Sequence, residues 1–486
     1  MALQDPSPIE KPAIARRSFS PRKQRALDLA ERLARERDGW IERHRFFFEE
    51  DWRYLRFLVP EGLRVLDLGC GTGALLKQLN PAYGVGIDFS AAMIEIARAR
   101  HPDLTFIDAD VETLNELTEL KGPFDVIVMS DTIGTLDDCE ETFRSLHRLC
   151  TPDTRIIVVY HSRMWEPVSM MHGAISQSRP SRPQNWLSSR DIANLLFLSD
   201  FDVIKREWRL LSPFRLFGVG RFINRYFATL PLIRKLCLRN YVIARSLLQR
   251  SDERPSASII VPCRNERGNI EPAVNRTPKL ADKQEIIFVE GGSADGTWQE
   301  VERVQAAYPH LTIKAFKQPG KGKGDAVRKG FDEATGDVLM ILDADLTTPP
   351  EDLPKFYEAL TRSKGEFING ARMTYPREKE SMRFLNLLAN HIFALIFTFL
   401  LNQRYTDTLC GTKVLLRRHY EKIVRDRAYF GDFDLIFGAS KLNLKTAEVP
   451  IRYAARAYGE TQISRFQHGW LLLRMVFFAF QKLKAL

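Results

Sequence analysis

Short apolar runs alternate with amphipathic stretches between residues 64 and 160 of the chain. The runs have the length of buried strands, and the stretches between them have the apolar spacing of helices. Strands that alternate with helices predict a parallel sheet covered by helices on both faces. The predicted strands are Arg64–Leu68, Tyr83–Asp88, Leu104–Ile107, Phe124–Met129 and Arg155–Tyr160, and the predicted helices include Gln24–Asp38, Ala74–Leu79 and Ala91–Arg100.

A second series of the same kind begins in the middle of the chain. Its predicted strands are Ala257–Val261, Glu285–Val289, Thr312–Phe316 and Asp337–Leu342. A fresh series indicates two α/β domains, which also fits a length of 486 residues. The expected organisation is a disordered basic arm (1–22), a first domain (23–250), a polar linker (251–258), a second domain (259–465) and a C-terminal apolar helix (466–486).

The region from 165 to 250 interleaves arginines with aromatic residues and has no clear period. It fits a basic amphipathic segment on a membrane surface, or helices packed on the first domain. Two further apolar stretches, Phe384–Leu401 and Trp470–Phe480, are too interrupted or too short for a clean membrane span. We therefore expect a protein that lies on a membrane, on its cytoplasmic face, rather than one that crosses it.

Composition narrows the picture only a little. The net charge of +10 fits nucleic acid, anionic membranes or phosphorylated substrates equally well. No nucleic-acid-binding motif is present, so no nucleic-acid partner is expected. The six cysteines have neither zinc spacing nor a C-x-x-C pair, and no signal peptide is apparent, so we expect reduced thiols in the cytoplasm.

Glycines follow the first predicted strand in the run Asp67-Leu-Gly-Cys-Gly-Thr-Gly73. Gly69, Gly71 and Gly73 let the backbone approach a ligand and expose N–H groups where a helix begins. Acidic residues stand at three successive strand ends, at Asp67, Asp88 and Asp108. In a parallel sheet such ends meet at one crevice, where nucleotide ligands bind.

With these residues, the chain resembles the class I S-adenosylmethionine (SAM)-dependent methyltransferases over about residues 45–165. The resemblance implies that Asp67 and the glycines hold the methionine part of SAM. It implies ribose binding for Asp88 and adenine binding for Asp108. Asp131, Tyr160 and His161 lie near the expected methyl group, where each is equally well a local hydrogen-bonding residue.

In the second domain, a buried strand ends in Asp343-Ala-Asp345. Two carboxylates at a strand end suit Mg²⁺ or Mn²⁺, which bind oxygen ligands together with substrate phosphates. Lys321 and Lys323 lie in a glycine-rich stretch that suits a pyrophosphate.

Together with the motifs around Pro262, Glu266 and Glu290, this order resembles the family 2 glycosyltransferases of the GT-A fold over about residues 255–465. The resemblance implies that these three residues line a nucleotide pocket and that Asp343 and Asp345 bind the metal and the nucleotide diphosphate. One acidic residue that the family usually has beside Glu290 is Gly291 here, and a basic residue is replaced by Gln462.

The motifs after Asp345 resemble those of dolichyl- and polyprenyl-phosphate sugar transferases, which implies that Arg372 and Arg383 bind an acceptor phosphate. A phosphate dianion needs no protein base, whereas a sugar hydroxyl does, and Asp432 or Asp434 would then supply it. The leading hypothesis is a bifunctional, membrane-associated enzyme. It would pass a sugar from a nucleotide sugar to a polyprenyl phosphate and a methyl group from SAM to an unknown acceptor. A glycan or glycolipid hydroxyl as sugar acceptor, or one domain acting only as a binding module, stays open.

Overall fold

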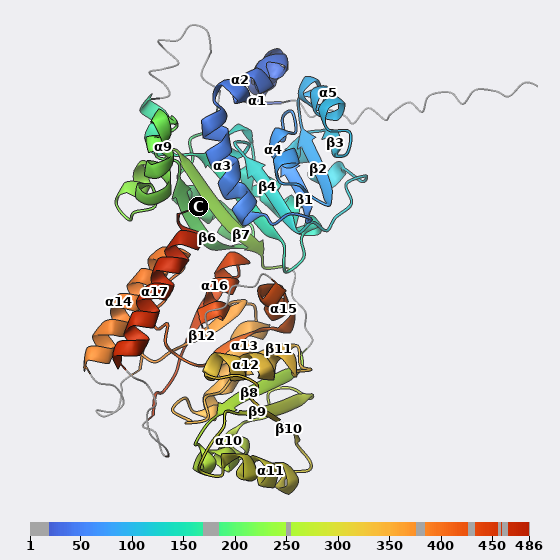
Figure 1. Cartoon of the computed structure of the whole chain (residues 1–486). Coiled ribbons are helices and arrows are strands. Elements are labelled where there is room, and N and C mark those ends of the chain that lie inside the picture. The colour runs from blue at the N-terminus through green and yellow to red at the C-terminus, as the bar shows by residue number, and fades with distance from the viewer. Residues whose placement is uncertain are drawn as a thin grey trace, which may run out of the picture.

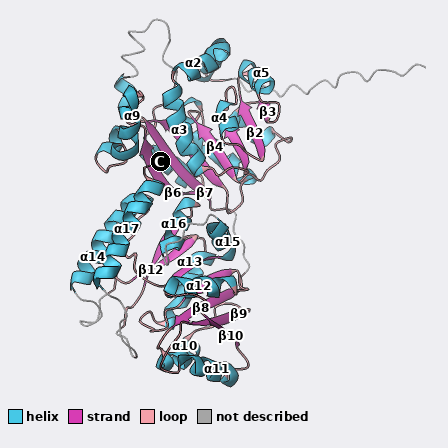
Figure 2. Ribbon diagram, viewed as in Figure 1, coloured by secondary structure: helices cyan, strands magenta, loops and turns pink. Residues whose placement is uncertain are grey.

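The computed structural model describes residues 19–168, 184–248, 254–375, 384–425, 433–454, 458 and 465–485. Two seven-stranded α/β sheets form successively along the chain, as Figures 1 and 2 show. This confirms the expected fold class. The expected basic arm lies outside the described residues up to residue 18.

The first sheet has the strand order β3-β2-β1-β4-β5-β7-β6. Its first five strands are parallel, and β7 runs antiparallel to both of its neighbours. Its strands are β1 (Arg64–Leu68), β2 (Tyr83–Asp88), β3 (Thr105–Asp108), β4 (Val126–Ser130), β5 (Arg155–His161), β6 (Phe201–Arg209) and β7 (Arg239–Ser246).

Helices line both faces of this sheet, where two clusters of buried apolar side chains form its core. Ser20 caps α1 by accepting from the Lys23 amide, and Pro21 at the first position is pre-set for a helix. The helices are α1 (Pro21–Leu33), α2 (Arg37–Arg43), α3 (Arg45–Leu58), α4 (Ala74–Gln78), α5 (Ala91–Arg100), α6 (Cys139–Leu146), α8 (Ser189–Leu198) and α9 (Val219–Phe222).

The second sheet has the order β10-β9-β8-β11-β13-β12-β14, in which only β13 runs antiparallel to its neighbours. Its strands are β8 (Ala257–Cys263), β9 (Gln284–Glu290), β10 (Thr312–Lys317), β11 (Val338–Ile341), β12 (Phe367–Ala371), β13 (Lys413–Leu416) and β14 (Thr446–Pro450). Since β8 starts at Ala257, the expected linker 251–258 runs two residues into a strand.

Two further apolar clusters sandwich this sheet. The long helices α14 and α17 pack against each other beside it (Figure 1). None of the described helices combines the length and hydrophobicity that a membrane span needs. The helices are α10 (Ile270–Arg276), α11 (Thr297–Ala307), α12 (Lys323–Asp332), α13 (Leu353–Thr361), α14 (Phe384–Leu401), α15 (Arg417–Arg425), α16 (Phe433–Lys441) and α17 (Arg465–Leu483).

Buried polar contacts join the two sheets. Arg155 at the start of β5 donates to Glu366 (2.8 Å) and to the Asn443 carbonyl (2.9 Å). At the end of α17, buried Lys484 pairs with Glu207 of β6 at 3.0 Å. Buried charges are stable only when paired, so these contacts require the two parts to pack together.

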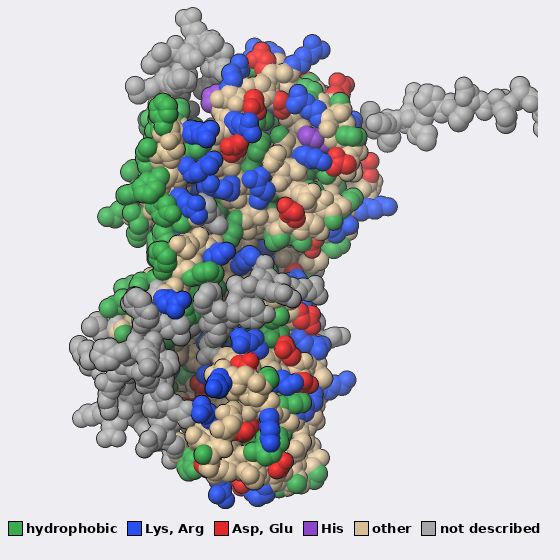
Figure 3. Space-filling view, in the orientation of Figure 1, with side chains coloured by type: hydrophobic (Ala, Val, Ile, Leu, Met, Phe, Trp, Pro, Cys, Tyr) green, Lys and Arg blue, Asp and Glu red, His purple; other side chains and the backbone are tan. Residues whose placement is uncertain are grey.

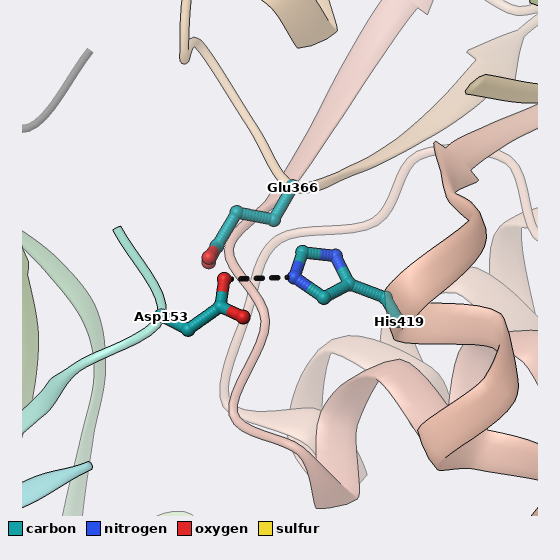
Figure 4. A group of neighbouring side chains, drawn as sticks. All are labelled: Asp153, Glu366 and His419. Carbon is teal, nitrogen blue, oxygen red and sulfur yellow. Dashed lines mark hydrogen bonds and ion pairs between the residues drawn. The ribbon is translucent and has the colours of Figure 1, made fainter. Parts of the chain in front are cut away.

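A carboxylate-histidine cluster lies at the same boundary. Figure 4 shows Asp153, Glu366 and His419 close together, and His419 Nε2 is 3.1 Å from Asp153. Cations surround both carboxylates, because Arg418 and Lys422 pair with Asp153 while Arg155 and Arg245 pair with Glu366. Their charge is already offset, so the cluster is better described as an electrostatic link between the sheets than as a metal site.

Candidate functional sites

The glycine turn after β1 is shaped by close contacts. Gly69, Gly71 and Gly73 all have positive φ, which non-glycine residues rarely adopt. A Cβ at Gly69 would lie 2.1 Å from the Thr132 hydroxyl, whereas a Cβ at Gly71 would meet nothing within 4 Å. A Cβ at Gly73 would lie 2.6 Å from the Phe106 ring, so the turn is packed tightly at both ends and open at Gly71.

Asp67 on β1 is the most unusual residue of this site. Its carboxyl group is buried, and neither oxygen has a hydrogen-bond partner. Burial, and then the nearby charge of Asp88, raise its pKa to about 7. A buried carboxylate without a partner is costly unless a cationic ligand pairs with it.

Asp88, at the end of β2, holds the turn in place. One of its oxygens accepts from the Gly71 amide at 2.8 Å, and the other accepts from the Ser90 amide at 3.0 Å. Ser90 in turn caps α5. Asp88 thus joins the turn to the start of the next helix at the point where the two strands end.

A cavity of about 790 Å³ opens at these strand ends. Gly69, Gly71 and Asp88 line one part of it, and the aromatic side chains of Trp40, Phe47, Phe48, Trp165 and Trp186 line another. This volume and lining suit a small organic ligand with a few polar contacts.

The structure does not bring Asp108 into this cavity. Its side chain is exposed at the last position of β3, whereas Asp110, two residues later, lines the cavity beside Val111. Asp110 caps the following helical turn and pairs with buried Lys23 of α1 at 2.6 Å. The carboxylate that the third strand supplies is therefore Asp110.

A buried ion cluster lies beside the cavity, and of its members the sequence had pointed only to Asp131 and His161. Arg239 of β7 is 1% exposed and binds both oxygens of Asp51 as well as the carboxylate of Asp131. Its pKa is raised, because these carboxylates outweigh the effect of burial. His161 lies 3.7 Å from Asp131, and both residues line the cavity.

In the second sheet, Asp343 and Asp345 follow β11. Asp343 pairs with Lys323, the first residue of α12, at 2.5 Å. Burial alone would raise the pKa of Asp343, but Lys323, Lys413 and Arg372 outweigh burial and lower it. Asp345 accepts from the hydroxyl (2.9 Å) and the amide (3.2 Å) of Thr347.

The loop before β13 closes on this pair of carboxylates. A Cβ at Gly411 would lie 2.0 Å from Asp343 Oδ2, so a larger residue there would displace this carboxylate. Lys413 is buried and donates to the Cys410 carbonyl. Cationic groups therefore approach Asp343 from both α12 and β13.

Arg372 makes contacts that its expected role did not predict. Its Nε and one terminal nitrogen donate to the two oxygens of fully buried Asp407, at 2.6 and 2.8 Å. A direct hydrogen bond to a phosphate would have to come from the remaining terminal nitrogen of Arg372. Arg383 and Asp432 lie outside the described residues, and so does the side chain of Asp434.

The loops after β8 and β9 interlock at the same edge of the sheet. Glu290 is buried and accepts from the Ser293 amide, and the Ser293 hydroxyl accepts from the Asn265 amide at 2.9 Å. Glu266 is also buried and accepts from Asn269 at 2.6 Å. Pro262 is half-buried at the end of β8, whereas Lys321 is exposed.

Comparison with known proteins gives each half a separate match. Residues 23–206 match a family model described as a methyltransferase domain, and residues 258–424 match the model of glycosyl transferase family 2. Among solved structures, the chain is similar to a S-adenosylmethionine dependent methyltransferase from Mesorhizobium loti, with 20% identity and a TM-score of 0.31. The alignment covers 40% of this chain and 97% of that protein.

The second half also matches curated relatives, among them two transferases. A dolichol-phosphate mannosyltransferase from Pyrococcus furiosus is 30% identical over 42% of this chain and 58% of its own length. An undecaprenyl-phosphate 4-deoxy-4-formamido-L-arabinose transferase from Proteus mirabilis is 26% identical over 43% of this chain and 62% of its own. The chain thus spans about three fifths of the length of these relatives.

Proposed function

Since the chain is an enzyme with a methyltransferase domain followed by a glycosyl transferase family 2 domain, we propose that it is bifunctional. The second domain, residues 259–465, transfers a sugar from a UDP- or GDP-sugar to a polyprenyl phosphate. The first, residues 23–250, transfers a methyl group from SAM. The chain works at the cytoplasmic face of the membrane, with the expected C-terminal helix (466–486), of which the structure describes α17 (Arg465–Leu483), beside it. The names of the two relatives support this class of acceptor.

The unpartnered carboxylate of Asp67 carries the proposal for SAM. The α-ammonium of SAM is the cation that this buried group lacks, and the open side of Gly71 admits the ligand. Asp88 binds the ribose hydroxyls, and Asp110 takes the place expected for Asp108 beside the adenine. When bound, SAM supplies an electrophilic methyl group, and the aromatic wall of the cavity orients the acceptor and excludes water.

The donor set after β11 fits Mg²⁺ or Mn²⁺. Asp343 and Asp345 offer carboxylate oxygens at one strand end, the ligand type that these ions prefer. When bound, the ion offsets charge on the leaving nucleoside diphosphate. Lys323 adds a cation beside Asp343, and exposed Lys321 meets the pyrophosphate from the loop before α12. Pro262, Glu266 and Glu290 line the nucleoside pocket.

The acceptor phosphate is the nucleophile of this reaction. A phosphomonoester is mostly a dianion at pH 7, so no protein base is required. Its oxygen attacks the anomeric carbon as the bond to the diphosphate breaks, which inverts the configuration. Asp407 holds Arg372 by two parallel hydrogen bonds, and Arg372 orients the phosphate together with Arg383. In this proposal Asp432 helps to orient the acceptor arginines.

The test is a transfer assay on the full chain with a panel of UDP- and GDP-sugars, Mg²⁺ or Mn²⁺, and undecaprenyl phosphate in detergent. Lipid-linked sugar that forms with the wild type and not with Asp345→Ala supports the proposal and identifies the donor. Asp282→Asn is the matched control, because Asp282 is fully exposed. Hydrolysis of the donor without a lipid product would contradict the proposal that the acceptor is a polyprenyl phosphate.

A further inference from the structure

The segment between β6 and β7 turns large apolar side chains toward solvent. Phe217 is fully exposed and Leu232 is 87% exposed. Soluble monomers rarely expose many large apolar side chains in one short segment unless a partner covers them. The apolar patch, as we call it, consists of Phe214, Leu216, Phe217, Val219, Phe222, Tyr226, Phe227, Leu232 and Leu236.

Buried contacts hold this segment in place beneath the patch. Asn224 is 5% exposed, accepts from the amides of Leu211 (2.9 Å) and Ser212 (2.8 Å), and donates to the Ser212 carbonyl (2.9 Å). A Cβ at Gly220 would lie 1.8 Å from the Phe214 carbonyl oxygen, so the turn requires glycine. The outward direction of the apolar side chains is thus built into the fold.

The backbone at the tip of the patch is strained. Leu216 and Phe217 have φ of 43° and 52°, in the left-handed region that bulky residues avoid. Such conformations cost free energy and persist where the surrounding structure imposes them, often at binding sites. Here the strained backbone holds two large apolar side chains that are half to fully exposed.

Basic residues lie among the apolar ones. Arg215, Arg221, Arg225 and Lys235 are all exposed within the same segment, and between residues 211 and 238 the sequence has no acidic residue. Aromatic and aliphatic side chains interleaved with cations match an interface of acyl chains and anionic headgroups. Arg221 pairs with Glu50 at 3.4 Å, and the charges of Arg215, Arg225 and Lys235 would oppose a second copy of the same patch.

The patch continues onto the second domain. Tyr226 stacks on Phe480 of α17 with ring centroids 6.5 Å apart, and Arg225 donates to the Ala485 carbonyl at 2.7 Å. Leu395 of α14 and Phe477 of α17 are 72% and 64% exposed. Figures 1 and 3 show α9, α14 and α17 along one side of the molecule, with apolar side chains gathered over the α9 region.

We propose that residues 211–238 of the methyltransferase domain dock the chain on a bilayer that contains anionic phospholipids. This rests on the proposed function, to which it adds a membrane contact outside the glycosyltransferase domain. The segment also borders the methyltransferase cavity, since Leu238 and Trp165 line it and Trp165 donates to the Leu236 carbonyl at 2.9 Å. Docking would therefore hold this cavity at the membrane, within reach of a lipid-linked methyl acceptor.

The test measures co-sedimentation of the full chain with phosphatidylcholine vesicles that contain or lack phosphatidylglycerol. The variant Phe217→Glu/Leu232→Glu removes two apolar contacts and adds negative charge. We expect it to bind phosphatidylglycerol vesicles at least about tenfold more weakly. Phe197→Glu on α8 is the matched control, because Phe197 is 73% exposed outside the patch. Arg215→Gln/Lys235→Gln should mainly reduce the preference for phosphatidylglycerol.

Wild-type vesicle affinity in the double glutamate variant would overturn the proposal. So would a wild-type dimer that this variant dissociates while neither protein binds vesicles, because the patch would then join two copies. Thermal unfolding checks that each variant is folded. Sugar transfer to a short-chain polyprenyl phosphate in detergent separates the two proposals. If the double glutamate variant keeps this activity but no longer binds vesicles, the proposed function is unaffected. If the wild type shows no sugar transfer, the result counts against the proposed function alone.

Discussion

The two domains place carboxylates at the ends of parallel strands, yet they treat those carboxylates in opposite ways. Asp67 is buried with no partner, and its pKa is raised to about 7. Asp343 is held by Lys323, and nearby cations lower its pKa. The first site lacks a positive charge, which the proposed SAM would bring. The second already contains cations, which fits the proposed binding of an anionic diphosphate beside a metal ion.

Asp343→Asn gives the largest expected effect. It keeps the shape of the side chain but removes the charge beside Lys323, so we expect sugar transfer to fall on the order of 10²–10³-fold. SAM binding by the first domain should be unchanged. The measurement is the initial rate of lipid-linked sugar formation at saturating donor, with Asp282→Asn as control. A rate within a factor of about three of wild type would mean that Asp343 lies outside the chemistry.

The contacts between the domains can be tested with Arg155→Ala. This leaves buried Glu366 with a more distant arginine, Arg245 at 3.6 Å, and removes the hydrogen bond to Asn443. We expect the free energy of unfolding to fall by about 3 kcal/mol. Calorimetry should then resolve two transitions where the wild type has one.

The control for this loss is Arg276→Ala. Arg276 pairs with Glu351 at a similar distance of 2.8 Å, but both side chains are about half exposed. Exposed pairs contribute less than about 1 kcal/mol. Equal losses in the two variants would show that the boundary between the domains is not coupled through Arg155.

Sequence patterns predicted β1–β5 and β8–β11 and the acidic residues that follow several of them, because both depend on neighbours along the chain. They did not predict β6, β7 or β12–β14. In β6 charged residues interrupt the apolar ones, and β7 is buried at every position and so shows no alternation. They also did not predict the Arg239–Asp51 pair, whose partners are 188 residues apart. Asp108 and Asp110 are equivalent in the sequence. Only the end of β3 at Asp108 and the turn that follows it decide which carboxylate reaches the cavity.

Asp67→Asn tests the role of the buried carboxylate at the first site. The carboxamide cannot pair with the ammonium of SAM, so we expect affinity for S-adenosylhomocysteine, which has the same ammonium, to fall about 10- to 100-fold. The ligand-free variant should be more stable than wild type at pH 8, because a buried, unpartnered charge has been removed. Calorimetric titration and urea unfolding measure the two effects.

The matched control is Asp103→Asn, which removes an exposed carboxylate of the same domain. It should change neither quantity appreciably. Loss of affinity together with loss of stability in Asp67→Asn would indicate that Asp67 has a structural partner.

The smallest effect is the pH dependence of ligand binding near neutral pH, which we expect from the carboxylate of the first site and not from that of the second. The pKa of Asp67 lies at about 7 in the folded protein against an ordinary value of 3.8. Free protein therefore keeps a proton there that the unfolded chain has lost. This contribution to stability is present below about pH 4 and is lost as the pH rises toward 7.

The site must release the proton to bind an ammonium group, so affinity for S-adenosylhomocysteine should fall by up to about tenfold per pH unit below 7. Asp343, whose pKa is lowered, stays ionised at these pH values.

The measurement is a series of ligand titrations between about pH 5.5 and about pH 7.5, a range that includes the pKa of Asp67. The affinity for S-adenosylhomocysteine should depend steeply on pH in the wild type and in Asp103→Asn, and should not depend on pH in Asp67→Asn. The same slope in all three proteins would place the titrating group elsewhere.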